Sequence, residues 1–221
     1  RELEAFAYTA SHDLKAPLVS IEGFVSLLER ELGDELGERG RHYLTRIHAN
    51  ALSMQRLITD LFAFARSGAD ERISEAIDTT ALAQELVEEW RDRADAAGMP
   101  LLLDGLLPSV RAHPVRLKQA LTNLIDNAIR YGSGQIRVSG STHDGLAEIV
   151  VEDGGTGVPV DDRAQMFDLF ARGNGVRQAV PDGTGLGLAL VKRIVESSGG
   201  DVRYEHTPAA RFVLSFPVVT P

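Results

Sequence analysis

A seven-residue repeat of apolar side chains in the first third of the chain constrains its fold more than any other feature. Apolar residues recur at alternating spacings of three and four between positions 14 and 32, and again between 44 and 65. Such a heptad pattern is typical of helices that pack along one another. Residues 33–40 carry three glycines and predict the turn of a helical hairpin. The repeat consists of Leu14, Leu18, Ile21, Val25, Leu28 and Leu32 in the first helix, and Leu44, Ile47, Ala51, Met54, Ile58, Leu61 and Ala65 in the second.

More apolar side chains lie on this hairpin than two helices can bury. Phe6, Phe24 and Leu57, for example, fall outside the repeat. Two hairpins would cover such positions in a four-helix bundle. We therefore expect residues 1–66 to be the dimerisation domain of a homodimer. A monomeric hairpin that packs on the rest of the chain is the alternative.

The pattern changes after the hairpin. Residues 67–77 are polar and predict a linker, and residues 78–221 alternate between helical and strand-like segments. We expect an α+β sandwich in which helices cover one face of a sheet. The expected helices span 79–97, 114–131, 161–170 and 185–198, and the expected strands span 100–104, 135–141, 146–152, 201–206 and 210–216.

Composition argues against several classes of function. The net charge is −9 and neither half of the chain is basic, so nucleic-acid binding is not expected. The absence of cysteine excludes disulfides and thiolate metal sites. No apolar run approaches the roughly 20 residues that cross a bilayer, so we expect no membrane contact within this part of the chain. The chain does not begin with Met, and we expect it to be the cytoplasmic piece of a longer protein, either soluble or membrane-anchored.

Two segments of the second part carry polar residues that packing alone does not explain. Asn123 and Asn127 lie one turn apart in an expected helix and therefore share a face. Their amide oxygens suit a hydrated Mg²⁺, although an asparagine satisfied by the backbone is the alternative. Asp153 ends an expected strand and can accept a hydrogen bond from an exocyclic amine. The glycines that follow it, within 154–157, allow close approach of a ligand or simply form a tight turn.

A third segment has glycines at 183, 185 and 187 and leads into a helix with an apolar face. The free N–H groups and the dipole of such a helix start favour phosphate. The segment is neither a Walker loop nor a clear dinucleotide fingerprint. Residues 167–184 are rich in glycine and polar side chains, a composition that fits a mobile flap over a nucleotide.

His12 stands out among the histidines because of its neighbours. It falls outside the line of Leu14 and Leu18, so its side chain can be exposed. Neutral imidazole is a competent nucleophile near neutral pH. Asp13 can accept a hydrogen bond from the Nδ1–H, which leaves Nε2 free to attack, and Pro17 predicts a bend in the helix beside it. Considered alone, an exposed histidine without a role is the alternative.

In this order and spacing, the segments resemble the GHKL ATPases, a group that includes DNA gyrase, a heat-shock chaperone, mismatch-repair proteins and histidine kinases. The resemblance covers about 1–66 and 78–221, and implies a Bergerat-type ATP-binding α/β sandwich after a dimerisation and phosphotransfer hairpin. The matching segments are SHDLKAPL (11–18) for the H box of histidine kinases, NLIDNAIRYG (123–132) for the N box, DGGTG (153–157) and GTGLGL (183–188) for the two glycine boxes, and FDLF (167–170) for the F box.

The resemblance implies a protein-histidine autokinase of a two-component system. ATP with Mg²⁺ would phosphorylate His12, and the phosphoryl group would pass to an aspartate of a response-regulator receiver domain. The implied roles are catalysis for His12, Asp13 and Arg172, Mg²⁺ ligation for Asn127 with support from Asn123, phosphate contact for Arg130, adenine contact for Tyr131, Asp153, Gly155 and Gly157, and a wrap around the triphosphate for Gly183, Thr184, Gly185, Leu186 and Gly187.

One position departs from the family pattern. Many members have Thr or Asn four residues after the histidine, where this chain has Ala16. Alanine cannot orient a water molecule by hydrogen bonding, so we expect weak phosphatase activity toward the regulator. A phosphatase-dominant relative, or a GHKL-type ATPase whose hairpin only dimerises, remains the alternative function.

Overall fold

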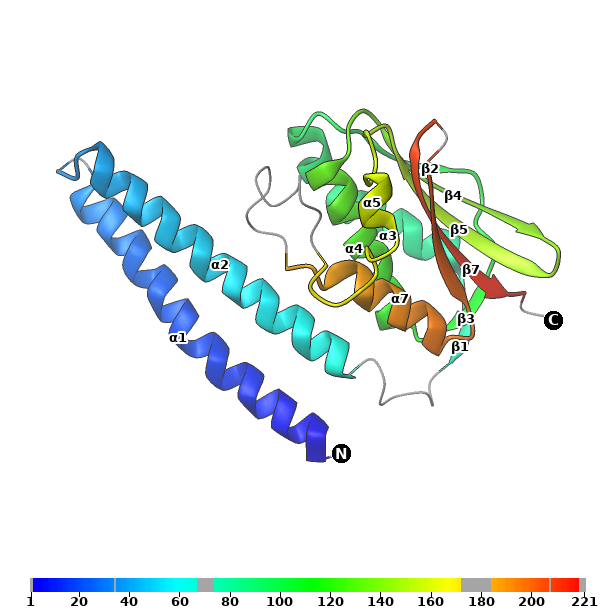
Figure 1. The fold of residues 1–221 in the computed structure, drawn as a ribbon, viewed down its shortest axis with the longest axis horizontal. Helices are drawn as coiled ribbons and strands as arrows, with labels where there is room; N and C mark the ends of the chain where they lie inside the picture. The colour runs from blue at the N-terminus through cyan, green and yellow to red at the C-terminus, as the bar shows by residue number, and fades with distance from the viewer. Residues whose placement is uncertain (1, 34, 67–73, 172–183, 207, 219–221) are drawn as a thin grey trace.

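A computed structural model describes residues 2–33, 35–66, 74–171, 184–206 and 208–218, with side chains for residue 14 and from residue 16 onward except 56, 60 and 62–66. Two long helices lie beside a unit in which helices stack on a sheet, and α2 contacts α7 (Figure 1). None of the described helices is both long enough and apolar enough to cross a bilayer. The elements are α1 (Glu2–Leu32), α2 (Glu38–Arg66), β1 (Glu75–Ile77), α3 (Thr79–Ala96), β2 (Leu101–Asp104), β3 (Val110–Ala112), α4 (Pro114–Tyr131), β4 (Ile136–His143), β5 (Leu146–Asp153), α5 (Val160–Arg163), α7 (Gly187–Ser197), β6 (Asp201–His206) and β7 (Ala210–Pro217).

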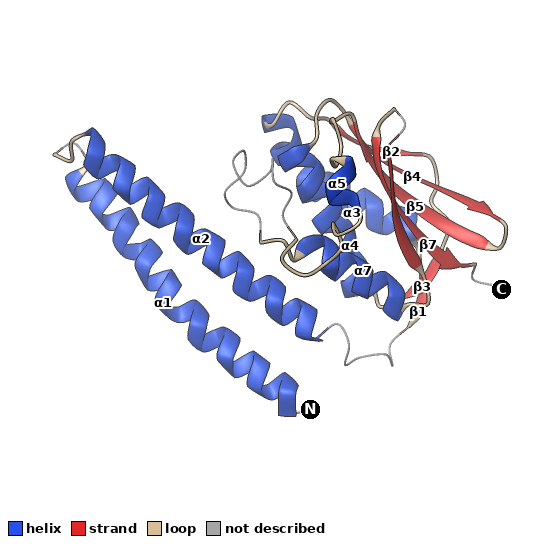
Figure 2. Cartoon of the chain, in the orientation of Figure 1, coloured by secondary structure: helices blue, strands red, loops and turns tan. Residues whose placement is uncertain are grey.

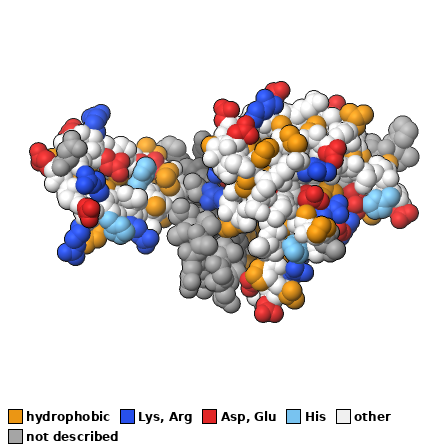
Figure 3. All heavy atoms as spheres, turned by 90° about the horizontal axis from the view of Figure 1, so that it is seen from above, with side chains coloured by type: hydrophobic (Ala, Val, Ile, Leu, Met, Phe, Trp, Pro, Cys, Tyr) orange, Lys and Arg blue, Asp and Glu red, His pale blue; other side chains and the backbone are white. Residues whose placement is uncertain are grey.

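The hairpin of α1 and α2 forms as predicted, but it buries only part of the heptad repeat. Leu18 and Val25 of α1 and Leu44 and Ala51 of α2 are buried between the helices. The positions between them face outward, because the two apolar positions of a heptad point in different directions around a helix. Apolar side chains are accordingly visible among charged ones at the hairpin surface (Figure 3). Leu32, at the end of the row of Leu18 and Val25, is 39% exposed. The outward-facing positions, accessible over 41–53% of their surface, are Leu14, Ile21, Leu28, Ile47, Met54 and Leu61.

The second part is a layer of helices on one face of a five-stranded sheet (Figure 2). The strand order is β2-β4-β5-β7-β6, in which β2 and β4 are parallel and all other neighbours are antiparallel. The core joins α3, α4 and α7 to the inner face of the sheet. The strands expected at 135–141 and 146–152 form the antiparallel pair β4–β5, and those expected at 201–206 and 210–216 form the antiparallel pair β6–β7.

Two parts of this unit differ from the sequence-based expectation. The short strands β1 and β3 pair with each other outside the main sheet, and β1 falls in the predicted linker. The expected helix over 161–170 is only α5 (Val160–Arg163) followed by turns. Phe167 packs against the core while Phe170 adopts a positive φ of 62°, so the chain turns to bring Phe167 inward instead of continuing the helix.

The outer face of the sheet carries a ladder of alternating charges across β5, β6 and β7. Glu148 is buried and accepts a 2.6 Å hydrogen bond from Arg203 Nη1. Arg203 also binds Glu205 at 2.9 Å, and Arg211 lies 3.5 Å from Glu205 and 3.2 Å from Glu152. Long charged side chains that pair in this way cover the apolar positions beneath them.

Glu148 should make the stability of the protein depend on acid pH. The hydrogen bond from Arg203 holds the pKa of Glu148 below its ordinary value of 4.5, so its stabilisation is present above that pH and is lost as the pH falls through the lower folded-state pKa. We expect Glu148→Gln to lower the free energy of unfolding at pH 7 by about 1–3 kcal/mol and to flatten its decline in acid. Chemical denaturation at several pH values measures both effects. Asp104→Asn, which breaks an exposed pair with Arg137 at 3.2 Å, is the control; an equal effect of the two variants would contradict the prediction.

Candidate functional site

The predicted asparagine face lies on α4, with Asn123, Asn127 and Arg130 half-buried and Tyr131 exposed at the helix end. The Nδ2 of Asn123 donates to the carbonyl of Gln119 at 3.0 Å. The backbone therefore satisfies one side of this amide, as the alternative to a ligand site requires. That bond leaves Oδ1 directed at the start of α7, where a Cβ on Gly187 would lie 3.2 Å from it. The asparagine face and the third glycine segment therefore lie next to each other.

The asparagine face is chemically suited to Mg²⁺. In the part of the chain that the structure describes, no group of three or more His, Cys, Asp or Glu side chains could hold a metal ion. Amide oxygens at Asn123 and Asn127 are suitable hard ligands, and Mg²⁺ usually takes its remaining ligands from water and substrate phosphates. The residues present therefore fit an ion that arrives with a nucleotide.

Asp153 sits in a pocket of backbone at the end of β5. Its side chain is 7% exposed and accepts a 2.7 Å hydrogen bond from the N–H of Gly155. A Cβ on Gly132 would lie 2.6 Å from Oδ1 of Asp153, and one on Gly155 would lie 2.7 Å away, so both positions need glycine. Burial raises the pKa of Asp153, while hydrogen bonds from the backbone of Gly155 and Ser133 oppose the increase. The site thus keeps a poorly solvated acceptor beside the end of α4.

The first glycine segment is held at its far end by β6. Gly157 has a φ of 69°, and a Cβ there would collide with the side chains of Tyr204 and His206. Oη of Tyr204 accepts a 2.8 Å hydrogen bond from the N–H of Val158. Arg163 Nε donates to the carbonyl of Val158 at 2.9 Å, and its guanidinium lies 5.4 Å from the Tyr204 ring centroid. Tyr204 and Arg163 were not expected as site residues, because neither belongs to a glycine segment or to the asparagine face and their contacts come from the fold.

Tyr204→Phe should therefore weaken nucleotide binding as well as stability. The variant keeps the ring but removes the acceptor for Val158, which should lower the free energy of unfolding by about 1 kcal/mol. Because the same loop carries Gly155 and Gly157, we also expect several-fold weaker ATP binding in titration calorimetry. Tyr43→Phe on the exposed surface of α2 is the matched control. Unchanged ATP affinity in Tyr204→Phe would show that the contact only stabilises the fold.

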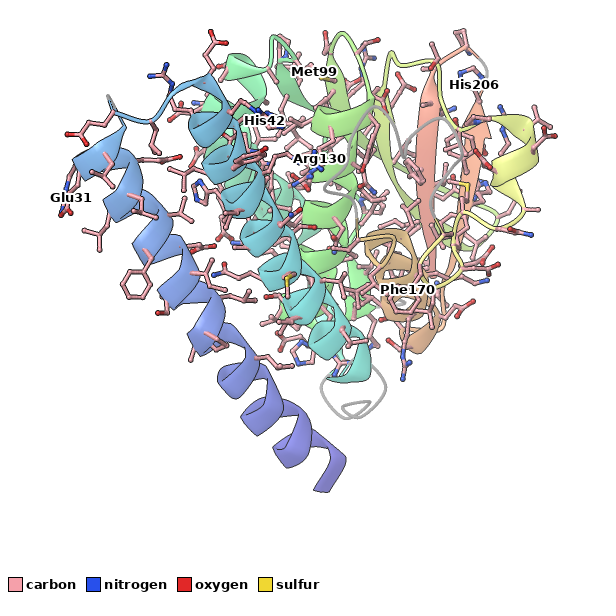
Figure 4. All side chains as sticks on the ribbon, turned by 60° about the vertical axis from the view of Figure 1, so that its left-hand side comes forward. Glu31, His42, Met99, Arg130, Phe170 and His206 are labelled. Atoms are coloured by element: carbon pink, nitrogen blue, oxygen red, sulfur yellow. The ribbon has the colours of Figure 1, made fainter. Side chains whose placement is uncertain are left out.

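The third glycine segment packs against the F box. Gly185 has a φ of 70°, and a Cβ there would lie 2.8 Å from the carbonyl carbon of Phe170. Phe170 lies near the start of α7 (Figure 4). Leu186 N–H donates to Thr184 Oγ1 at 3.3 Å, and α7 begins at Gly187 without a side-chain cap from the described residues. Among the described residues, no side chain caps the first N–H groups of α7, and N–H groups at a helix start favour an anion.

Several predicted residues are beyond what the structure describes. Arg172 and Gly183 lie outside the described residues, as does most of the predicted flap. His12 and Asp13 belong to α1, but their side chains are outside the description. Ala16, one turn after His12, is exposed.

Comparison with known proteins agrees with this arrangement. The model of histidine kinase-, DNA gyrase B- and HSP90-like ATPases matches residues 112–220, and the model of the His Kinase A (phospho-acceptor) domain matches residues 2–70. The methanogenesis regulatory histidine kinase FilI of Methanothrix harundinacea is 31% identical over 226 residues, covering 100% of this chain and 25% of FilI. The sensor histidine kinase YkoH of Bacillus subtilis is 32% identical over 208 residues, covering 93% of this chain and 45% of YkoH.

The crystal structure of full-length ShkA in complex with AMPPNP superimposes with a TM-score of 0.72 at 29% identity, over 98% of this chain and 46% of ShkA. The chain thus spans between a quarter and about half of the length of these relatives. A phospho-acceptor hairpin followed by an ATPase sandwich, in this order, places the chain in the sensor histidine kinase family as its catalytic core.

Proposed function

We propose that this chain is an ATP-dependent autokinase that phosphorylates His12 and passes the phosphoryl group to an aspartate of a response-regulator receiver domain. The proposed division is 1–66 for dimerisation and phosphotransfer, 67–77 for the linker and 78–221 for ATP binding. Pairing of β1 with β3 ties the end of this linker to the ATP-binding part. Phosphatase activity toward the regulator is proposed to be weak because of Ala16.

The observation that carries the proposal is that the asparagine face of α4 lies beside both glycine segments, 153–157 and 184–187. Its C-terminal end meets Asp153 through Gly132, and Asn123 meets the start of α7 through Gly187. At a rise of 1.5 Å per residue, these two positions are about 13 Å apart along the helix. That span accommodates an adenine at one end and a triphosphate at the other.

The residues of the chain would divide the work of phosphoryl transfer between binding and positioning. Asp153 accepts a hydrogen bond from the adenine amino group, and Tyr131 stacks on the ring. The N–H groups at the start of α7 and the side chain of Arg130 hold the phosphates, and Arg172 steadies the γ-phosphate. Asn127, with Asn123, would ligate Mg²⁺, which supplies neutralisation of phosphate charge.

His12 then supplies the nucleophile. Its Nε2 forms a bond to the γ-phosphorus as the bond to the β,γ-bridging oxygen breaks, so that ADP leaves in line with the attack. Asp13 accepts a hydrogen bond from Nδ1–H and so keeps Nε2 free to attack. Val19 and Ser26, one and two heptads after His12, are exposed, which supports an accessible position on α1.

A homodimer follows from the outward-facing heptad positions of the hairpin. Leu14, Ile21 and Leu28 on α1 repeat every seven residues, as do Ile47 and Met54 on α2, and all of them are exposed in the single chain. A second hairpin would bury both rows in a four-helix bundle. Because these side chains are already about half covered in the single chain, completing their burial contributes roughly half of the about 1.5–3 kcal/mol that burying a whole aliphatic side chain provides, which favours association.

Labelling with γ-³²P-ATP and Mg²⁺ tests the proposal by the chemistry of the product. Phosphohistidine is labile in acid and stable in alkali, whereas phosphoserine and phosphothreonine show the reverse. We expect a protein-bound label that is lost in acid and kept in alkali. Hydrolysis of ATP without any protein-bound label would instead support an ATPase whose hairpin only dimerises.

A further inference from the structure

Asp126 of α4 lies at the centre of a charged cluster that the proposed mechanism does not use. Its Oδ2 accepts a 2.6 Å hydrogen bond from Nε of Arg130, one turn further along the same helix. Its Oδ1 lies 2.6 Å from Nη2 of Arg93 on α3. The guanidinium of Arg93 in turn lies 4.7 Å from the ring centroid of Trp90, a side chain that packs against the core.

We propose that Asp126 is a positioning residue that orients Arg130 toward the phosphates of ATP, and that Arg93 holds Asp126 in place. The proposal rests on the proposed function, because it requires a nucleotide on the face of α4. Arg130 lies three residues after Asn127 and seven after Asn123, so helical spacing places the three side chains on the same face of α4.

The geometry of the guanidinium explains how one carboxylate can aim it. Arginine carries five N–H donors in a rigid plane, so a short bond at Nε fixes the plane of the whole group. The four remaining donors, on Nη1 and Nη2, then form the edge that binds anions. A free arginine side chain would lose rotamer entropy when it binds phosphate. Ordering by Asp126 removes much of that loss before the nucleotide arrives.

Burial distinguishes this cluster from an ordinary pair that joins two helices. Lys118 also links α4 to α3, through Glu85 at 2.7 Å and Glu89 at 3.0 Å. Those side chains are 33%, 62% and 52% exposed. In the cluster, Arg93 is 49% exposed like a surface pair, but Arg130 and Asp126 are only 17% and 25% exposed. The Lys118 pairs join the two helices on the surface, whereas the pair of Arg130 with Asp126 lies within α4 and is the more buried one.

A double-mutant cycle measures whether Asp126 acts through Arg130. The full chain is prepared as wild type, Asp126→Asn, Arg130→Gln and the double variant, and dissociation constants for Mg-ATP are compared with inhibition constants for adenosine. We expect each single variant to bind ATP about tenfold more weakly. The double variant should bind no more weakly than Arg130→Gln, because the carboxylate has no role once its arginine is gone. Adenosine, which lacks phosphate, should bind all four proteins equally.

Two further variants keep the proposal testable if Asp126→Asn does not fold. Arg93→Gln should weaken ATP binding several-fold without changing adenosine binding, and Lys118→Gln, the matched control at the same pair of helices, should change neither. Three outcomes would contradict the proposed role of Asp126 without affecting the proposed function. They are additive losses in the cycle, equal losses of ATP and adenosine binding, and wild-type ATP binding by Asp126→Asn. A wild-type protein that binds neither compound would overturn the proposed function itself.

Discussion

Replacement of Asp153 by asparagine should weaken ATP binding by about 10- to 100-fold, the range of a hydrogen bond to a charged group, without destabilising the nucleotide-free protein. Burial raises the pKa of Asp153 in the folded state. A raised folded-state pKa means that the protonated acid is favoured on folding, so the ionised carboxylate opposes folding as the pH rises through that pKa. Asparagine removes the charge and can still accept the hydrogen bond of Gly155. The unfolding temperature of the Asp153→Asn protein at pH 7 should therefore equal or exceed that of the wild type.

Glu152→Gln is the matched control for this variant. Glu152 is the preceding residue of β5, points to the opposite face of the sheet and pairs with Arg211 at 3.2 Å. Calorimetric titration should show normal ATP affinity for Glu152→Gln and the predicted loss for Asp153→Asn. Normal ATP affinity in Asp153→Asn would remove Asp153 from the site, and a large drop in its unfolding temperature would show that the carboxylate has a structural role instead.

His12→Gln should abolish the acid-labile phosphoryl label while leaving ATP binding unchanged. Glutamine keeps a polar side chain on α1 but has no nucleophilic nitrogen, so the chemical step is lost and the nucleotide site, formed by other elements, remains. His42→Gln replaces an exposed histidine of α2 in the same way and should retain the label. Scintillation counting after alkaline treatment measures the phosphoryl label, and calorimetric titration with ATP measures nucleotide binding. Persistent label in His12→Gln would place the acceptor elsewhere.

Much of the architecture could be predicted from periodicity alone. Heptad spacing predicted both hairpin helices, and the strand-like segments predicted the strands of the main sheet, two pairs of which are antiparallel neighbours in the structure. The paired strands β1 and β3 were missed because three residues are too few to show a period. The helix was expected to continue beyond Arg163, but it ends there. Phe167 packs against the core, a tertiary contact that overrides the local pattern, and the chain turns at Phe170, which has a positive φ.

The site shows the same division between local signal and tertiary contact. Asn123, Asp153 and Gly187 could be named because their residue types and spacing point to ligand chemistry. The contacts that hold them in place come from distant segments. Tyr204 reaches the first glycine segment from β6, and Arg93 reaches Asp126 from α3. No spacing rule links such pairs, so only the folded structure reveals them.

The most direct test of the account is identification of the phosphorylated residue. The wild-type chain is incubated with Mg-ATP, digested near neutral pH to preserve phosphohistidine, and analysed by mass spectrometry. We expect phosphate on the imidazole of His12, formed only when ATP is present. Phosphate on a different residue, or ATP bound at the site of Asp153 with His12 unmodified after long incubation, would contradict it.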